Sequence, residues 1–167
     1  NNISFYTSFR LRHKVLYDIL KDATLFYKNA LFSNEEAYKY CESRNLSQDI
    51  IESFSIGYSP DYDKLINFLL AKGYKKEDIF NSGIAIEVEG KLKDRFANRL
   101  VFPITDLNGK VVAFSGRIIQ QSDMAKYVNS PETEIFIKGI FGKLCPSTSI
   151  SPTLIFSLSS HFSSIPL

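Results

Sequence analysis

The sequence predicts an α+β fold, because helical periodicity occupies the first half of the chain and strand alternation the second. Apolar residues recur at helical spacing over 14–31, and shorter helical patterns continue to residue 82. From residue 83 the apolar period changes to two, and the turn pair Asn108-Gly109 joins two apolar runs. We therefore expect amino-terminal helices followed by a small, largely antiparallel sheet, with a disordered carboxy-terminal tail.

Three helices are expected in the first third of the chain. The first covers residues 14–31. Ser33 then opens the sequence S-N-E-E, which is typical of a capping box with Glu36, and a second helix follows. Ser47 can cap a third, short helix by accepting a hydrogen bond from its first turn.

The segment 56–60 (I-G-Y-S-P) is expected to interrupt the helices, because glycine frees the backbone and proline restricts its predecessor. Asp61 or Asp63 can cap the next helix, and Gly73 suits the position just after its end. Gly83 is expected to stop one further short helix in the same way.

Three strands are expected in the second half. Residues 84–88 alternate between apolar and polar side chains, as a half-buried strand does. Residues 100–104 form a second apolar run, in which Pro103 indicates an edge or a bulge. A third strand over 110–114 follows the hairpin turn.

Composition and charge narrow the class of protein. Apolar residues make up 44% and charged residues 23% of the chain, as in ordinary soluble proteins. The two cysteines, Cys41 and Cys145, form no disulfide motif, so we expect a reducing, cytoplasmic location. We see neither a secretory signal nor an apolar run that could span a membrane, and expect no membrane partner. Residues 91–143 hold nine Lys/Arg against five Asp/Glu, which permits a polyanion-binding face.

Several short segments carry a more specific signal. They are Phe54–Pro60 (FSIGYSP), Asp94–Ile104 (DRFANRLVFPI), Asp106–Arg117 (DLNGKVVAFSGR), Lys126–Thr133 (KYVNSPET) and Phe136–Gly139 (FIKG). In these segments, from about Val15 to Phe141, the chain resembles the bacterial DnaG-type DNA primase family. The order and spacing of the segments are those of the family, which makes a chance match improbable.

The resemblance implies the amino-terminal subdomain of the RNA-polymerase core, in an enzyme that makes RNA primers for DNA replication. In the family this part faces the single-stranded DNA template and the RNA primer hybrid. The neighbouring TOPRIM subdomain binds divalent metal and carries out nucleotidyl transfer on nucleoside triphosphates. On this basis we expect no catalytic residue, metal site or cofactor in this chain itself. Mg²⁺ or Mn²⁺ would serve the complete enzyme through TOPRIM.

The chain departs from the family pattern at several positions. Ala97 and Ser115 stand where the family often has Arg and Gly, so one basic contact is expected to be missing. The resemblance implies an unmatched leader over 1–13, the primase subdomain over 14–143 (helical to 82, β-rich from 83) and an aberrant tail over 144–167. Residues 145–167 hold eight Ser, three Pro and no Asp, Glu, Lys or Arg. We expect a truncated or frameshifted frame that is inactive alone and lacks the helicase-binding domain.

Seven residues are predicted to bind nucleic acid or nucleotide. They are Arg95, Arg99, Arg117, Lys126, Tyr127, Asn129 and Lys138. Arg and Lys neutralise phosphates, and an aromatic ring such as that of Tyr127 stacks on unpaired bases. The competing interpretation is structural: ion pairs with Asp94 or Glu132 for the cations, and core positions for Phe96 and Phe136.

Two other chemistries are considered and set aside. Asp61 and Asp63 resemble a metal-binding pair, but no third carboxylate accompanies them, so helix capping is preferred. His13, Cys41, Cys145 and His161 lack the spacing of a zinc site. Two alternative functions stay open: a stand-alone single-stranded nucleic-acid-binding module, and a helical interaction protein that acts through residues 14–54.

Overall fold

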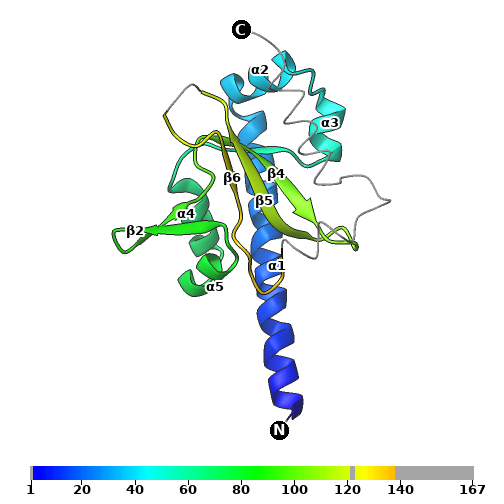
Figure 1. Ribbon diagram of the computed structural model, residues 1–167, viewed down its shortest axis with the longest axis vertical. Helices are drawn as coiled ribbons and strands as arrows, with labels where there is room; N and C mark the ends of the chain where they lie inside the picture. Colours follow the sequence, from blue (N-terminus) through cyan, green and yellow to red (C-terminus); the bar gives the residue numbers. More distant parts are fainter. Residues whose placement is uncertain (1, 121–122, 138–167) are drawn as a thin grey trace.

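The computed structural model describes residues 2–120 and 123–137, which form an α+β fold as the sequence predicts (Figure 1). A long helix, α1, runs along the whole molecule, and a four-stranded sheet lies across it. The helices are α1 (Asn2–Phe32), α2 (Glu35–Ser43), α3 (Gln48–Ser53), α4 (Lys64–Ala71) and α5 (Lys76–Asn81). The predicted disordered tail over 144–167 lies outside the described residues, as does Lys138.

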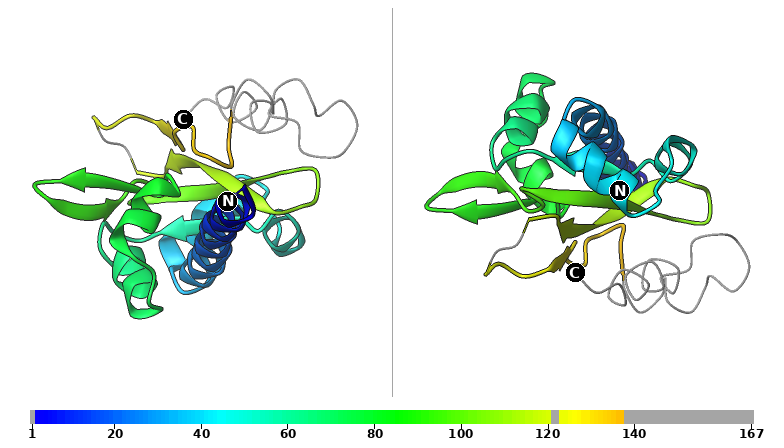
Figure 2. Two further views of the ribbon diagram at one scale, coloured as in Figure 1. Left: turned by 90° about the horizontal axis from the view of Figure 1, so that it is seen from below. Right: turned by 90° about the horizontal axis from the view of Figure 1, so that it is seen from above.

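Every strand pair is antiparallel, as expected. The larger sheet has the order β1-β4-β5-β6, and a separate hairpin pairs β2 with β3. The strands are β1 (Gly57–Ser59), β2 (Ala85–Val88), β3 (Lys91–Asp94), β4 (Arg99–Thr105), β5 (Val111–Ile118) and β6 (Tyr127–Asn129). Two views along α1 show α1, α4 and α5 on the same side of the larger sheet (Figure 2).

Most helix ends follow the local chemistry of the sequence. The hydroxyl of Ser47 accepts a hydrogen bond from the Ile50 N–H at 3.4 Å, which caps α3 as predicted. Gly73 and Gly83 follow α4 and α5 with φ angles of 91° and 78°, the left-handed conformation that favours glycine. The prediction for α2 is wrong by one residue, because the side chain of Asn34, not Ser33, accepts from the Ala37 N–H at 2.8 Å.

The first helix is longer than its apolar pattern indicates. It begins at Asn2, whereas the periodicity predicts a start near residue 14. Residues 7–12 are exposed on all sides of the helix, so no buried stripe marks this part in the sequence. None of the described helices, α1 included, combines the length and apolar character that a bilayer crossing requires.

The predicted break at 56–60 contains a strand instead. Gly57, Tyr58 and Ser59 pair with Val101, Leu100 and Arg99 of β4 and form the edge of the larger sheet. Gly57 lies so close to α1 that a Cβ built on it would sit 2.4 Å from the Cβ of Tyr27. The glycine is therefore needed for close approach of two backbones, a requirement that local sequence does not reveal.

Two more strands were absent from the prediction. The first is β3, which pairs with β2. The tight turn between them contains Glu89 and Gly90, whose φ angles of 51° and 72° fit a type I′ turn. The second is β6, at residues 127–129, where no strand was predicted and which pairs with β5. Pro103 behaves as predicted: it lies on β4 beyond the end of β1, and the register shifts between Ile104 and Thr105.

The main core lies between α1 and the sheet. Tyr27 of α1, Phe96 and Phe114 are fully buried there, and Phe114 stands edge-on to both other rings at 5.6 and 5.9 Å. A second cluster joins Leu31, Cys41 and Ile51 of the first three helices to Tyr58 and Leu100 of the sheet. The apolar faces of α1, α2 and α3 are thus turned into the core. Phe96 and Phe136 are core residues, as the structural interpretation predicted.

Candidate nucleic-acid interface

One cross-strand row of the larger sheet ends in an exposed tyrosine. Tyr58, Leu100, Arg117 and Tyr127 are direct partners in β1, β4, β5 and β6, so they share a face of the sheet. This is the face opposite to the row of Gly57, which contacts α1. Arg117 is only 6% exposed, whereas Tyr127 is 37% exposed. The row therefore leads from the core to the surface.

Two cations lie close to the ring of Tyr127. The guanidinium carbon of Arg117 lies 5.7 Å from the ring centroid and Nζ of Lys126 lies 5.9 Å from it. Both distances fall within the range of a cation–π interaction. Asn129, which is also exposed, is two residues further along β6 and therefore on the same face as Tyr127. The structure thus brings four predicted residues together, and we call Arg117, Lys126, Tyr127 and Asn129 the Tyr127 patch.

Arg99 approaches the Tyr127 patch from beneath. It begins β4, is 3% exposed, and donates from Nη1 to the Ala97 carbonyl at 2.9 Å and from Nη2 to the Ala125 carbonyl at 3.0 Å. Ala125 immediately precedes Lys126. The side chain of Arg99 therefore joins the start of β4 to the backbone that enters β6.

Arg95 lies elsewhere. It is half-buried beside the α5–β2 connection, where Nε donates to the Gly83 carbonyl at 3.0 Å and Nη2 to the Ala85 carbonyl at 3.5 Å. Burial lowers the pKa of Arg95. The structure does not bring Arg95 to the Tyr127 patch.

The predicted alternative of ion pairs with Asp94 does not hold. Asp94 is fully buried and accepts hydrogen bonds from the Tyr27 hydroxyl at 2.9 Å, the Ser59 hydroxyl at 2.6 Å and the Phe96 N–H at 2.8 Å. None of these donors is charged. The carboxylate of Asp94 therefore serves a neutral network that connects α1, β1 and the end of β3.

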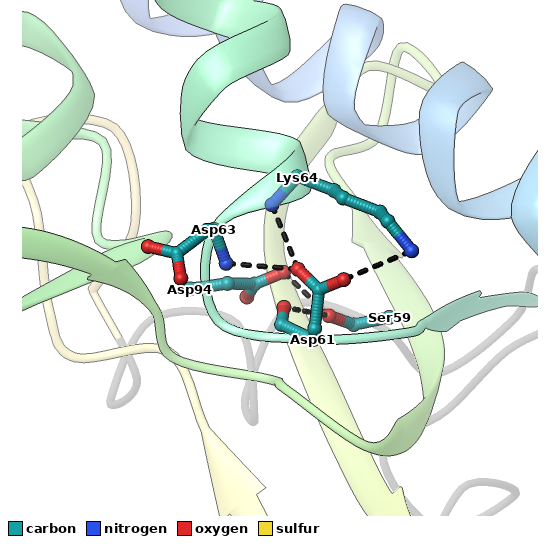
Figure 3. A network of polar contacts seen from close by, with 5 residues as sticks. All are labelled: Ser59, Asp61, Asp63, Lys64 and Asp94. Carbon is teal, nitrogen blue, oxygen red and sulfur yellow. Dashed lines mark hydrogen bonds and ion pairs between the residues drawn. The ribbon is translucent and has the colours of Figure 1, made fainter.

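Asp61, next to this network, is a helix cap (Figure 3). Its Oδ1 accepts from the Asp63 and Lys64 N–H groups at 2.9 and 2.8 Å, and Nζ of Lys64 lies 3.1 Å from Oδ2. Burial alone would raise the pKa of Asp61, but these hydrogen bonds outweigh it and the pKa is lowered. Asp63 pairs with Lys93 at 2.7 Å. Asp61 therefore caps α4 as predicted, whereas the side chain of Asp63 forms an ion pair and no cap hydrogen bond.

Burial gives Asp94 an unusual titration. Burial raises the pKa of Asp94 from its ordinary value of 3.8 to about 6, against the opposing effect of hydrogen bonds from Ser59, Phe96 and Tyr27. The folded state then holds the proton more tightly than the unfolded state. The resulting stabilisation is complete below about pH 4 and is lost as the pH rises through about 6.

This titration predicts a pH dependence that Asp94→Asn removes. A difference of roughly 2 pKa units corresponds to about 3 kcal/mol. We expect the wild-type free energy of unfolding, measured relative to that of Asp94→Asn, to fall by about this amount between pH 4 and pH 7. Urea unfolding across the range measures it. The variant serves as the reference because Asp22 and Asp61, whose pKa values are lowered, make the fold more stable as the pH rises and would mask the effect of Asp94. A flat difference curve would contradict the assignment.

The turn after β6 is held firmly in place. The Ser130 hydroxyl accepts from the Phe114 N–H at 2.9 Å, and the Ser130 N–H donates to the Phe114 carbonyl at 2.9 Å. Thr133 and Phe136 form a small bridge through two backbone hydrogen bonds of 2.9 and 3.2 Å. The two Ser130 hydrogen bonds anchor the end of β6, which carries Asn129, to β5, and the bridge fixes the turn that follows.

Comparison with known proteins decides the family. Residues 26–141 match the family model of the DNA primase catalytic core, N-terminal domain. The chain belongs to the DNA primase family. The DNA primase of Clostridium acetobutylicum is 35% identical over 140 residues, which cover 83% of this chain and 23% of that protein. This chain thus spans about a quarter of the length of that primase.

Solved primase structures share the fold. The Aquifex aeolicus primase, with its zinc-binding and RNA polymerase domains, has a TM-score of 0.72 and 31% identity over 77% of this chain and 32% of its own. A DnaG primase catalytic domain bound to ssDNA has a TM-score of 0.69 and 34% identity over 78% of this chain and 43% of its own. The primase-like segments therefore occupy a primase-like fold.

Sequence reasoning missed one buried group in these primase segments. Asp94 was considered only as an ion-pair partner. Its hydrogen-bond donors could not be found from local sequence, because Tyr27 and Ser59 are distant in the chain and the third donor is the backbone N–H of Phe96. Ala97, where the primase family often has Arg, is fully buried. Within the described residues, no group of three or more His, Cys, Asp or Glu side chains is arranged to hold a metal ion.

Proposed function

We propose that the chain binds single-stranded nucleic acid at the Tyr127 patch and serves a DNA primase by holding template and primer. The observation that carries the proposal is the exposed ring of Tyr127 with two cations within 6 Å of its centroid. An exposed aromatic ring stacks on an unpaired base, and the exposed ammonium of Lys126 suits a neighbouring phosphate. The ssDNA complex of a related catalytic domain supports the same partner.

Substitution of the exposed members should weaken binding in two distinguishable ways. Lys126→Ala removes a phosphate contact, so the slope of log Kd against log salt should fall by about 1. Tyr127→Ala removes stacking, so affinity should drop roughly tenfold with little change in slope. Fluorescence anisotropy with a labelled oligothymidine strand, repeated over a salt series, measures both quantities for the full chain.

Lys91→Ala is the matched control. Lys91 is exposed, and its substitution removes the same charge, but it lies on β3 of the separate hairpin. We expect the affinity of Lys91→Ala to stay within twofold of wild type. Its salt slope should equal that of wild type within error. Equal effects of Lys91→Ala and Lys126→Ala would mean that binding follows net charge, and the Tyr127 patch would lose its role.

Primer synthesis itself belongs to the longer enzyme in this proposal. The divalent metal that the family implies does not fit the described carboxylates, since Asp61 caps a helix and Asp63 pairs with Lys93. We propose that another part of the enzyme holds the metal and the nucleoside triphosphate, and that this chain alone is inactive. A primer-synthesis assay with and without an added TOPRIM-containing fragment tests this division. Synthesis by the chain alone would overturn it.

The helical interaction protein is the weaker candidate. Its partner would need a continuous apolar surface on residues 14–54. Leu31, Cys41 and Ile51 are buried in the core, and among the large apolar side chains of this range Leu25 and Phe32 are exposed. The stand-alone nucleic-acid module makes the same binding prediction as the primase proposal. It differs in expecting no gain of synthesis when the TOPRIM-containing fragment is added.

A further inference from the structure

The path of the Arg99 side chain is set by a glycine. Gly116 of β5 lies over it: a Cβ built on Gly116 would sit 3.1 Å from Cδ of Arg99, 3.4 Å from its Cβ and 2.7 Å from a ring carbon of Phe96. Arg99 pairs with Ile118, two residues beyond Gly116 on β5. Its side chain therefore passes β5 beside Gly116, which has no side chain to block it, and reaches Ala125 in the segment that enters β6.

On the far side, the guanidinium secures the residues that form the exposed part of the Tyr127 patch. The Ile118 N–H donates to the Lys126 carbonyl at 3.0 Å, and Nη2 of Arg99 donates to the Ala125 carbonyl at 3.0 Å. The peptide groups on both sides of Lys126 are thus tied to the sheet. If the bond from Arg99 were lost, the bond from Ile118 to the Lys126 carbonyl would be the one that remains of the two.

Arg99 does not reach the surface itself. It is 3% exposed, and Nη1 and Nη2 donate to backbone carbonyls 2 and 26 residues away. Among the described residues it forms no ion pair. A forked guanidinium can hold two carbonyls at once in fixed geometry, which the single ammonium of lysine cannot reproduce.

We propose that Arg99 is a positioning residue, which fixes the backbone of Lys126 and Tyr127 for nucleic-acid binding and does not contact the nucleic acid. The consequence for binding rests on the proposed function of the Tyr127 patch. The ordering of the backbone by Arg99 is independent of that function and can be measured without any ligand.

Hydrogen exchange of the free full-length chain tests the ordering. In Arg99→Lys, which keeps the charge and most of the stem, we expect the Ile118 amide, which donates to the Lys126 carbonyl, to exchange about tenfold faster or more. The amides of β5 residues 112–114 should exchange at the wild-type rate, which shows that the fold is intact. Unchanged exchange at Ile118 in both Arg99→Lys and Arg99→Ala would overturn the proposal.

Binding of the oligothymidine strand tests whether Arg99 acts through the Tyr127 patch. Arg99→Lys and Arg99→Ala should each weaken binding about fivefold or more, because charge without the fork does not restore the geometry. In a Lys126→Ala/Tyr127→Ala background, Arg99→Ala should change the affinity less than twofold. An equal effect in both backgrounds, with a further fall in salt slope of about 1, would show direct phosphate contact and overturn the proposal.

The two experiments separate the proposal from the proposed function. Faster exchange in Arg99→Lys together with no measurable binding by the wild-type chain would reject the nucleic-acid role and retain Arg99 as the residue that orders this backbone. Normal binding by the wild-type chain and by both Arg99 variants would reject the positioning role and retain the Tyr127 patch.

Discussion

Gly57→Ala is expected to destabilise the fold by about 3 kcal/mol or more. The added Cβ would lie 2.4 Å from the Cβ of Tyr27, 2.6 Å from the carbonyl carbon of Tyr27 and 2.8 Å from the Lys28 nitrogen. Two of these atoms belong to the backbone of α1, which cannot rotate away as a side chain can. Relief would require moving β1 off the helix, at the upper end of the cost of overpacking. Urea unfolding followed by circular dichroism measures the loss.

Gly73→Ala is the control for Gly57→Ala. Gly73 follows α4 with a φ angle of 91°, and a Cβ built there meets no atom within 4 Å. Its cost should be about 1 kcal/mol, from backbone strain alone. If Gly57→Ala cost no more than Gly73→Ala, close packing of β1 on α1 would not be a major source of stability.

The helical half of the fold could be predicted because its signals are local. The cap at Ser47 and the glycines after α4 and α5 each act on a backbone turn within a few residues. The error at α2 is of the same kind, since Asn34 and Ser33 are adjacent residues that both favour capping. The start of α1 could not be found, because its exposed first turns carry no apolar stripe.

The missed strands depend on partners that are distant in the sequence. The three residues of β1 become a strand because β4, some forty residues later, supplies hydrogen bonds, and because Gly57 has no side chain to collide with Tyr27. The three residues of β6 show no strand pattern of their own, and their strand exists through pairing with β5. Tertiary pairing thus overrides local propensity in both cases.

In the candidate site, too, local residue type predicts some features and tertiary structure decides the others. Residue type marked Lys126 and Tyr127 as candidates for nucleic-acid binding; both are exposed, and their binding stays a prediction. Residue type could not distinguish them from Arg99, which is buried among backbone carbonyls. The distinction depends on Gly116, whose missing side chain leaves the passage for Arg99.

Asp94→Ala should be another large loss, about 3 kcal/mol or more at pH 7. The substitution leaves the hydroxyls of Tyr27 and Ser59 and the Phe96 N–H without their acceptor in the core. Each buried donor left unsatisfied costs roughly 1–3 kcal/mol. Removing the buried carboxylate relieves its own desolvation, which offsets only part of this cost. Urea unfolding again measures the change.

Two surface aspartates provide the controls and separate the possible causes. Asp63→Ala breaks an exposed ion pair with Lys93 and should cost at most about 1 kcal/mol. Asp61→Ala removes the cap of α4 and should cost about 1 kcal/mol. A loss for Asp94→Ala no greater than these would show that the three donors find other acceptors. A larger loss would show that one carboxylate, through Tyr27, Ser59 and Phe96, holds α1, β1 and the connection from β3 to β4 together. That connection leads directly to Arg99, so the same buried network would also support the backbone beneath the Tyr127 patch.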